Sequence, residues 1–215
     1  MCIRDRVNIE LLTGHYTFIV DKQEKVAGQR AQRIVIQPVD KFRYGHRLWV
    51  DVETGLLLKT QLLDENNKLL EQFMFTEIEF MDKVPEELLQ PQATGPEYTW
   101  YETETVDDEP NDDSPNNWEV KSLPSGFGQD SARSHHKADK VPVEHLIFSD
   151  GLASVSVFIE AREDKSPAIM GLSRMGAINA YGRMLENYYV TAVGEVPGIT
   201  VRMIGESVTY KHTND

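Results

Sequence analysis

Residues 42–63 read FRYGHRLWVDVETGLLLKTQLL. Apolar and polar residues alternate along Phe42–Val50, a turn signal follows at Asp51–Gly55, and Leu56–Leu63 begins a second apolar run. Period-two spacing interrupted by a short turn predicts two β-strands. A connection this short joins antiparallel neighbours, because parallel strands need a longer crossover. The side chains predicted to share one face are Phe42, Tyr44, Leu48 and Val50, with Arg43, Arg47 and Trp49 on the other.

The same pattern continues on both sides of this segment. We predict further strands at His15–Val20, Gln32–Gln37 and Leu69–Phe80, which together give an antiparallel meander. The last strand is apolar on both faces, with Phe73 and Phe75 on one side. Such a sheet must be covered twice or must curve around something apolar. Helices of the same protein and the acyl chains of a ligand both satisfy that requirement.

Residues 116–215 predict a second, smaller sheet. Ser149-Asp150-Gly151 separates two apolar runs, and Asp-Gly supplies the positive φ angles of a tight hairpin turn. Pro197 suits the first turn of a helix that we expect to continue to about Ile204. We place a turn at Gly182, between two further strands. The predicted strands are Trp118–Leu123, Val143–Phe148, Leu152–Glu160, Met170–Tyr181 and Arg183–Val193. The predicted fold class is therefore β-rich α+β.

Charge separates these two sheets along the sequence. The chain carries a net charge of −13, yet residues 85–115 hold ten acidic and no basic residues, together with five prolines. Like charges without an apolar period favour an extended linker. The predicted organisation is a first domain at residues 7–84, a linker at 85–115 and a second domain at 116–215. A calcium loop at Asp107–Asp113 is the alternative, although the alternating oxygen ligands and the mid-loop glycine are missing.

Composition excludes several classes of protein. No apolar run reaches the ~18 residues of a membrane span, and the acidic balance without a basic stripe argues against nucleic-acid binding. Cys2 is the only cysteine, so an intrachain disulfide is excluded. Residues 1–6 (MCIRDR) lack the apolar region of a secretory signal. We interpret them as an artefact on an N-terminally truncated protein.

The sequence contains no recognisable catalytic motif. The six histidines lack metal-ligand spacing, and there is no nucleophile elbow, Walker loop or dinucleotide fingerprint. We therefore expect no metal, no cofactor and no enzymatic activity. A hydrolase whose catalytic residues are distant in sequence remains an alternative hypothesis.

Several segments resemble the MucB/RseB family of periplasmic sigma-factor regulators. In the first domain these are Phe42–Asp51, Glu53–Leu57, Leu62–Glu65 and Leu70–Met74. In the second domain they are Leu123–Phe127, Phe148–Leu152 and Val193–Pro197. The match runs in order from about residue 12 to residue 207. The family's N-terminal part, with its signal peptide, is expected to be missing.

This resemblance implies a fold and a function. The family's large domain is similar to LolA-type lipoprotein carriers, so the first domain is expected to be part of a curved half-barrel. The family binds the periplasmic part of a membrane-bound anti-sigma factor, shields it from proteolysis, and is released by lipopolysaccharide or lipoprotein signals. The protein is therefore expected in the periplasm. The residues predicted to line a lipid-facing hollow are Phe42, Tyr44, Leu57, Phe73 and Phe75.

For the anti-sigma factor, the predicted surface is the segment from Arg174 to Tyr189. Arginine and tyrosine are frequent anchors of protein interfaces, and an ordinary sheet face is the alternative reading. The predicted partner-binding residues are Arg174, Tyr181, Arg183, Tyr188 and Tyr189. A lipid or lipoprotein carrier without a regulatory partner is the second functional hypothesis. Homo-oligomers formed through an open sheet edge are a further expectation.

Overall fold

The computed structural model describes residues 12–89, 117–136, 142–161 and 169–211. The predicted artefact at residues 1–6, most of the predicted linker and the alternative calcium loop lie outside these ranges. Of the predicted linker, residues 85–89 are described, and a 3₁₀ helix, η1 (Glu86–Leu89), lies within them. We refer to residues 12–89 as the first domain and to residues 117–211 as the second domain.

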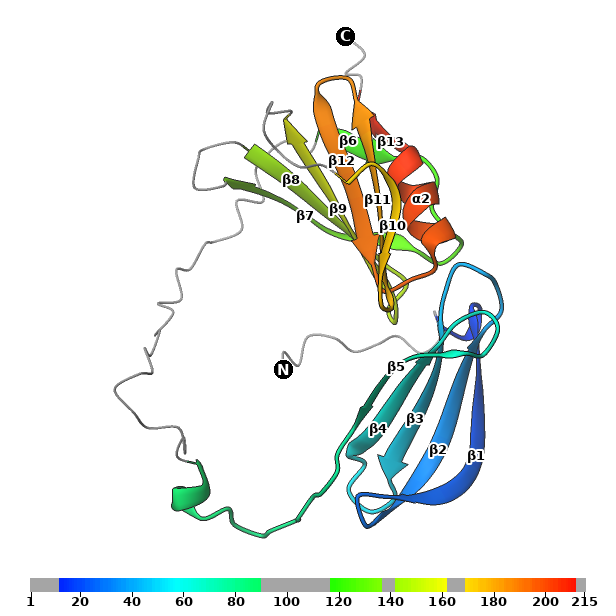
Figure 1. Cartoon of the computed structure of the whole chain (residues 1–215), viewed down its shortest axis with the longest axis vertical. Coiled ribbons are helices and arrows are strands. Elements are labelled where there is room, and N and C mark those ends of the chain that lie inside the picture. Colours follow the sequence, from blue (N-terminus) through cyan, green and yellow to red (C-terminus); the bar gives the residue numbers. More distant parts are fainter. Residues whose placement is uncertain (1–11, 90–116, 137–141, 162–168, 212–215) are drawn as a thin grey trace.

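The first domain is an open five-stranded sheet whose antiparallel strands follow the order of the sequence (Figure 1). Its strands are β1 (Tyr16–Val26), β2 (Gln29–Pro38), β3 (Gly45–Asp51), β4 (Leu57–Leu63) and β5 (Leu69–Met74). Ala27 and Gly28, both at positive φ, make the tight turn from β1 to β2. The predicted meander is confirmed.

Strand β5 ends earlier than the sequence predicted. The apolar run continues to Phe80, but pairing with β4 stops at Met74. Phe75 and Ile78 instead pack against a buried cluster that includes Trp49 and Leu58. The N–H of Phe75 still donates to the carbonyl of Leu58 at 3.0 Å, and beyond it the packing of these two half-buried side chains replaces strand pairing.

The second domain combines a six-stranded antiparallel sheet with one helix and a two-stranded ribbon. The sheet order is β10 (Gly171–Met175), β11 (Ile178–Leu185), β12 (Tyr188–Gly194), β9 (Ser154–Ala161), β8 (Pro142–Ser149) and β7 (Gly128–His136). Helix α2 (Gly198–Glu206) lies across one face of this sheet, beside β6 (Trp118–Val120) and β13 (Val208–Tyr210) (Figure 1).

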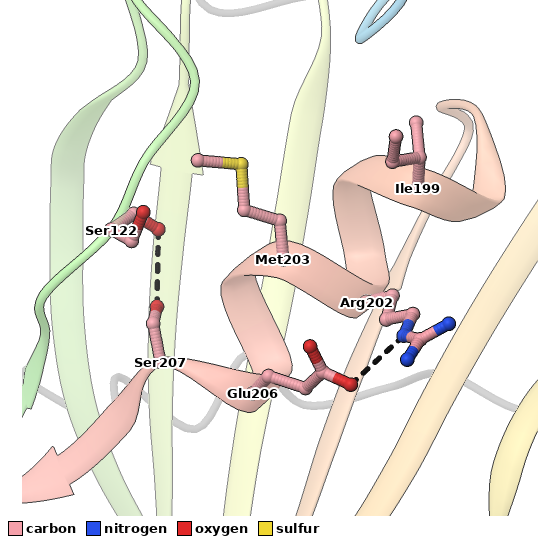
Figure 2. A pocket seen from close by; sticks show the side chains of 6 residues that line it. All are labelled: Ser122, Ile199, Arg202, Met203, Glu206 and Ser207. Atoms are coloured by element: carbon pink, nitrogen blue, oxygen red, sulfur yellow. Dashed lines mark hydrogen bonds and ion pairs between the residues drawn. The ribbon is translucent and has the colours of Figure 1, made fainter.

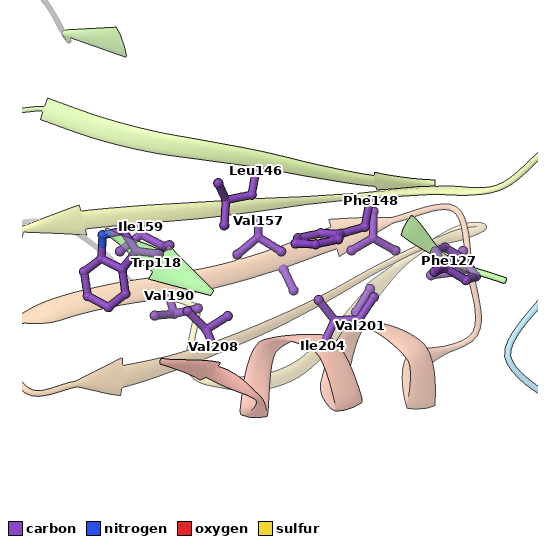
Figure 3. Close-up of a cluster of buried hydrophobic side chains, with 13 residues drawn as sticks. Trp118, Phe127, Leu146, Phe148, Val157, Ile159, Val190, Val201, Ile204 and Val208 are labelled. Carbon is purple, nitrogen blue, oxygen red and sulfur yellow. The ribbon is translucent and has the colours of Figure 1, made fainter. Parts of the chain in front are cut away.

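The core of the second domain lies between the sheet and α2 (Figure 3). Alternate side chains of β9 point into it, and Val155, Val157 and Ile159 are at most 1% exposed, as the period-two pattern predicted. From the helix, Val201 and Ile204 are fully buried against them. The predicted helix after Pro197 is confirmed, and the Asp150–Gly151 hairpin lies where the sequence placed it.

The turn predicted at Gly182 is wrong. Gly182 lies in the middle of β11, where a Cβ atom would overlap the carbonyl of Ile169. Close approach of the backbone, and not a change of chain direction, therefore requires this glycine. The actual turns flank β11, and they contain Gly176 and Glu186, both at positive φ.

Candidate functional site at the domain junction

Arg43 is a fully buried side chain that joins the two domains. Its Nε donates a hydrogen bond to Oδ2 of Asp150 at 2.5 Å. The other guanidinium nitrogens donate to the carboxylate of Asp40 and to the carbonyl of Ser125. Asp40 belongs to the first domain, whereas Ser125 and Asp150 belong to the second. One arginine from the connection before β3 thus binds two separate loops of the second domain.

Asp150 receives four hydrogen bonds in the turn between β8 and β9. Oδ1 accepts the backbone N–H groups of Leu152 and Ala153 at 2.9 and 2.8 Å. Oδ2 accepts the Tyr16 hydroxyl at 2.9 Å as well as Arg43. Burial would raise the pKa of Asp150, but the N–H donors of Ala153 and Leu152, with Arg43, hold that pKa below its ordinary value.

The direction of that pKa shift determines the pH range in which the contact stabilises the folded state. A carboxyl whose pKa is lowered by folding stabilises the folded state at neutral pH, and this stabilisation is lost only as the pH falls through the lowered value. Burial, and then Asp150, raise the pKa of Tyr16, so its hydroxyl remains a donor at neutral pH. The ion pair at the junction therefore persists through the physiological range.

A second set of contacts lies beside this ion pair. Nδ2 of Asn179 donates to the Tyr44 hydroxyl at 2.9 Å and to the carbonyl of Val196 at 2.8 Å. The hydroxyl of Thr200, on α2, donates to the carbonyl of Phe42 at 2.7 Å. The bonds from Asn179 to Tyr44 and from Thr200 to Phe42 cross from one domain to the other. Helix α2 is thereby tied to the first domain.

One face of the first sheet carries a row of mainly apolar side chains, and the side chains at both ends of this row are exposed to solvent. Strand register places five residues side by side on this face, namely Val20, Ile34, Leu48, Thr60 and Phe73. Val20 is 73% exposed and Phe73 is 56% exposed, whereas Ile34 and Leu48 between them are half-buried. We call this row the apolar face. It is a surface to which an acyl chain or another apolar group could bind.

The five predicted lipid-lining residues do not share one surface, because they divide among this face, the cluster that contains Trp49, on which Phe75 packs, and the junction. Leu57 lies opposite Val50, on the same side of the sheet as Phe73, and Phe75 packs edge-on against Phe73 with a centroid distance of 5.4 Å. Tyr44 is buried at the junction, and Phe42 lies beside it. Because β3 begins only at Gly45, the alternation predicted across residues 42–44 does not hold. Their role in lipid binding stays a prediction.

Among the predicted partner-binding residues, Arg183 is used internally. Its Nε donates to the carbonyl of Gly205 at 2.8 Å, and its Nη2 donates to the carbonyl of Val208 at 2.6 Å. It therefore holds the end of α2 and the start of β13. Tyr181, on the same strand, donates to Glu206 of α2 at 3.3 Å.

Of the other three predicted partner-binding residues, Arg174 is exposed, whereas Tyr188 and Tyr189 are half-buried. Arg174 is exposed on β10, at the edge of the sheet. Tyr188 packs edge-on against Trp118 with a centroid distance of 4.9 Å. Tyr189 follows it on β12 and therefore points to the opposite face. The structure thus does not gather the five into one exposed cluster, and their binding role stays a prediction.

An open hollow of about 500 Å³ lies along the outer side of α2 (Figure 2). Ile199 and Met203 supply its apolar part. Arg202 and Glu206 form an ion pair at 2.8 Å at one end, and the Ser207 hydroxyl donates to the carbonyl of Ser122 at the other. These charged and polar groups already have partners within the chain.

Within the described ranges, no three His, Cys, Asp or Glu residues gather as a metal site. No helix in the same ranges is both long and apolar enough to span a membrane.

Sequence reasoning missed the centre of the junction. Arg43 was placed on the polar face of a strand, and Asp150 was explained by its turn alone. The two residues are 107 positions apart, so periodicity contains no signal for their pairing. The one local hint is that Arg43 stands between two aromatic residues, Phe42 and Tyr44.

Comparison with known proteins agrees with this architecture. The model of the MucB/RseB N-terminal domain matches residues 4–93, and that of the MucB/RseB C-terminal domain matches residues 112–209. The chain belongs to the MucB/RseB family. It is 33% identical over 213 residues to the sigma factor AlgU regulatory protein MucB of Pseudomonas aeruginosa. That match covers 92% of this chain but only 61% of MucB, so the chain spans about three fifths of its relative's length.

Solved MucB structures share the fold. The chain resembles MucB in the Pseudomonas aeruginosa MucA/MucB complex with a TM-score of 0.76 and 29% identity, covering 99% of this chain and 71% of that one. A crystal structure of MucB with MucA(peri) gives a TM-score of 0.74 at 29% identity, covering 98% and 74%. The β-rich α+β class with an open, LolA-like curved sheet, predicted from the sequence and the resemblance, is confirmed.

Proposed function

We propose that this chain is part of a periplasmic negative regulator of an envelope-stress sigma factor. In this proposal it binds the periplasmic part of a membrane-bound anti-sigma factor and protects that factor from proteolysis. The observation that carries the proposal is the two-domain architecture, which is similar over 99% of the chain to MucB in complex with MucA. The buried Arg43 junction supports it, because a fixed arrangement of two domains can offer one continuous binding surface. This function requires no step in which a covalent bond is made or broken, so the proposal is that the protein is not an enzyme.

The test is a pull-down of the full chain with the periplasmic segment of MucA as the probe. Arg174→Ala is expected to weaken binding about ten-fold, because truncating an anchoring arginine costs roughly 1–2 kcal/mol. Arg174 is exposed, so this substitution is expected to leave the fold intact. Arg30→Ala, which removes an exposed arginine from the first domain, is the matched control.

Two outcomes have different meanings. Binding that survives Arg174→Ala unchanged removes Arg174 from the interface and leaves the proposed function standing. An unaltered chain that binds no MucA segment contradicts the proposed function. Arg183→Ala is a poorer probe, since it also removes the bonds that hold α2 and β13.

We further propose that lipopolysaccharide or a related lipid releases the partner by binding to the apolar face. The open ends of that face, at Val20 and Phe73, support this reading. If lipid and partner favour different arrangements of the two domains, each weakens the binding of the other by the same factor. Lipid binding would then release the anti-sigma factor from the chain.

Substitution of Phe73 by serine is expected to weaken this lipid effect. It removes a large exposed apolar group, so more lipopolysaccharide would be needed to release the MucA segment in the pull-down. Phe80→Ser is the control, because Phe80 is similarly exposed, at 44%, but lies outside the sheet. Equal lipopolysaccharide dependence of both variants and the unaltered chain would exclude Phe73 from lipid sensing.

The same apolar face supports a second candidate, a lipid or lipoprotein carrier without a regulatory partner. Transfer of a bound lipid to acceptor vesicles in the absence of any MucA segment would favour the carrier. Strand β1 lies at the edge of its sheet and exposes Phe18, Ile19 and Val20. An apolar edge of this kind favours self-association, which sedimentation over a range of concentrations would measure.

A further inference from the structure

The turn between β8 and β9 covers one end of the sheet surface that carries the apolar face. Period-two alternation along β1 and β2 puts Tyr16 and Ile36 on the same side of the sheet as Val20. Tyr16 and Ile36 are only 2% and 6% exposed, whereas Val20 is 73% exposed. Leu152, in the turn, packs on the buried cluster that these two residues form with Leu12. A side chain of the second domain thus closes the surface at the junction.

Leu152 packs on the same cluster as the centre of the apolar face. Ile34 and Leu48, from the middle of that row, also pack on this cluster. Gly151 lies beside it too, because a Cβ atom added there would stand 3.7 Å from Cδ2 of Leu12. An apolar group that binds along the row and extends toward the junction must therefore contact Leu152 or take its place.

The size and composition of the row suit an acyl chain. Neighbouring strands lie about 4.8 Å apart, so a row across the whole sheet is roughly 19 Å long, the length scale of an extended fatty acyl chain. Thr60 is the one polar residue among the five that form the row. An acyl chain also offers more apolar surface for burial than a single leucine, which favours replacement of Leu152 by the chain.

The same turn carries the ionic contact of the junction. Oδ2 of Asp150 accepts hydrogen bonds from Tyr16 and Arg43. Oδ1 of the same carboxylate accepts the backbone N–H of Leu152 at 2.9 Å, so the leucine and the carboxylate are held together. Movement of Leu152 away from the cluster would therefore move the acceptor of Arg43 as well. Apolar packing and the ion pair are coupled through one turn.

We propose that this turn transmits binding of a lipopolysaccharide acyl chain to the domain junction. The acyl chain lies along the apolar face and displaces Leu152 from its cluster. Asp150 moves with the turn, and the contacts that hold the two domains together are lost. The closed state does not accept the whole chain, so it lowers the apparent affinity for lipid. The inference rests on the proposed function and identifies the element that moves.

The first test is thiol labelling of the full chain carrying Leu152→Cys and Cys2→Ser, with and without lipopolysaccharide. Displacement of residue 152 from the cluster is expected to raise its rate of reaction with a maleimide several-fold. Leu185→Cys in the same background is the matched control, because Leu185 is also half-buried but packs on the core beneath α2. Its rate is expected to stay unchanged. Co-sedimentation with lipopolysaccharide, on the same samples, measures binding itself.

Each result of the labelling experiment decides the proposal. Lipopolysaccharide that binds while the reaction at residue 152 stays unchanged or becomes slower would overturn it, since Leu152 would then be untouched or covered. A chain that binds no lipopolysaccharide would overturn it as well. The proposed function is decided separately, because the MucA segment is pulled down in the absence of lipid.

A second test changes the size of the competing side chain. Leu152→Ala is expected to lower the lipopolysaccharide concentration for half-maximal binding several-fold, because a smaller side chain holds the closed end of the face less firmly. Leu152→Met keeps the apolar volume and is expected to bind as the unaltered chain does. Circular dichroism confirms that each variant folds. Binding by the alanine variant that is equal to or weaker than that of the unaltered chain would contradict the competition.

Discussion

Replacing Arg43 by methionine is expected to lower the free energy of unfolding by about 3–5 kcal/mol, the usual cost of removing one partner of a buried ion pair. The cause is Asp150, which would stay buried and charged without its guanidinium partner. Asp40 and the Ser125 carbonyl would lose donors as well. Urea titration followed by circular dichroism measures the change. Arg47→Met, on β3, is the control, since Arg47 is only half-buried.

A double substitution separates the effect of losing the ion pair from the effect of changing the side-chain volume. In Arg43→Met with Asp150→Asn, the asparagine oxygen still accepts the N–H groups of the turn, but no unpaired charge is buried. This double variant is expected to recover much of the lost stability. An Arg43→Met protein no less stable than Arg47→Met would show that the ion pair does not hold the junction.

Replacing Phe148 by alanine is expected to cost about 3–5 kcal/mol, because it leaves a cavity in a closely packed core. Phe148 is 2% exposed and lies in the cluster beneath α2 (Figure 3). The chain should then lose MucA binding at temperatures where the unaltered chain retains it. Thermal unfolding measures the loss of stability.

Phe158→Ala is the matched control for that substitution. Phe158 lies on the neighbouring strand, is only half-buried and stacks on His145 with a centroid distance of 4.3 Å. The same group of atoms is removed at a more exposed site, so a clearly smaller loss is expected. Equal losses for the two variants would mean that the side of the sheet facing α2 is not the main core.

Local patterns in the sequence predicted the strands well, because each strand depends on neighbours a few residues away. Alternation located the buried side chains of β9, and Asp150-Gly151 located the hairpin. The turn at Gly182 was wrong because glycine marks close backbone approach as well as turns, and the sequence alone does not separate these uses. The end of β5 was missed because packing of Phe75 and Ile78 overrides their strand preference.

The candidate site was harder to predict, since its contacts join residues that are distant in the sequence. Tyr44 pairs with Asn179 across 135 positions, and Thr200 reaches Phe42 across 158. Periodicity placed Tyr44 in an apolar row but gave no reason for its hydroxyl to be bound. Arg183 looked like a surface anchor because its use at the end of α2 depends on a helix that packs across the sheet.

The contacts at the junction have a consequence for a nicked chain. They run from residues 16–44 to residues 125–200, whereas the covalent connection between the domains leaves the first at Leu89 and enters the second at Asn117. That connection is therefore a tether that sets the effective concentration of each half near the other, and the bonds themselves lie elsewhere. A single proteolytic cut between Leu89 and Asn117 would leave every one of those bonds intact. The two fragments would remain one particle at high concentration and separate on dilution.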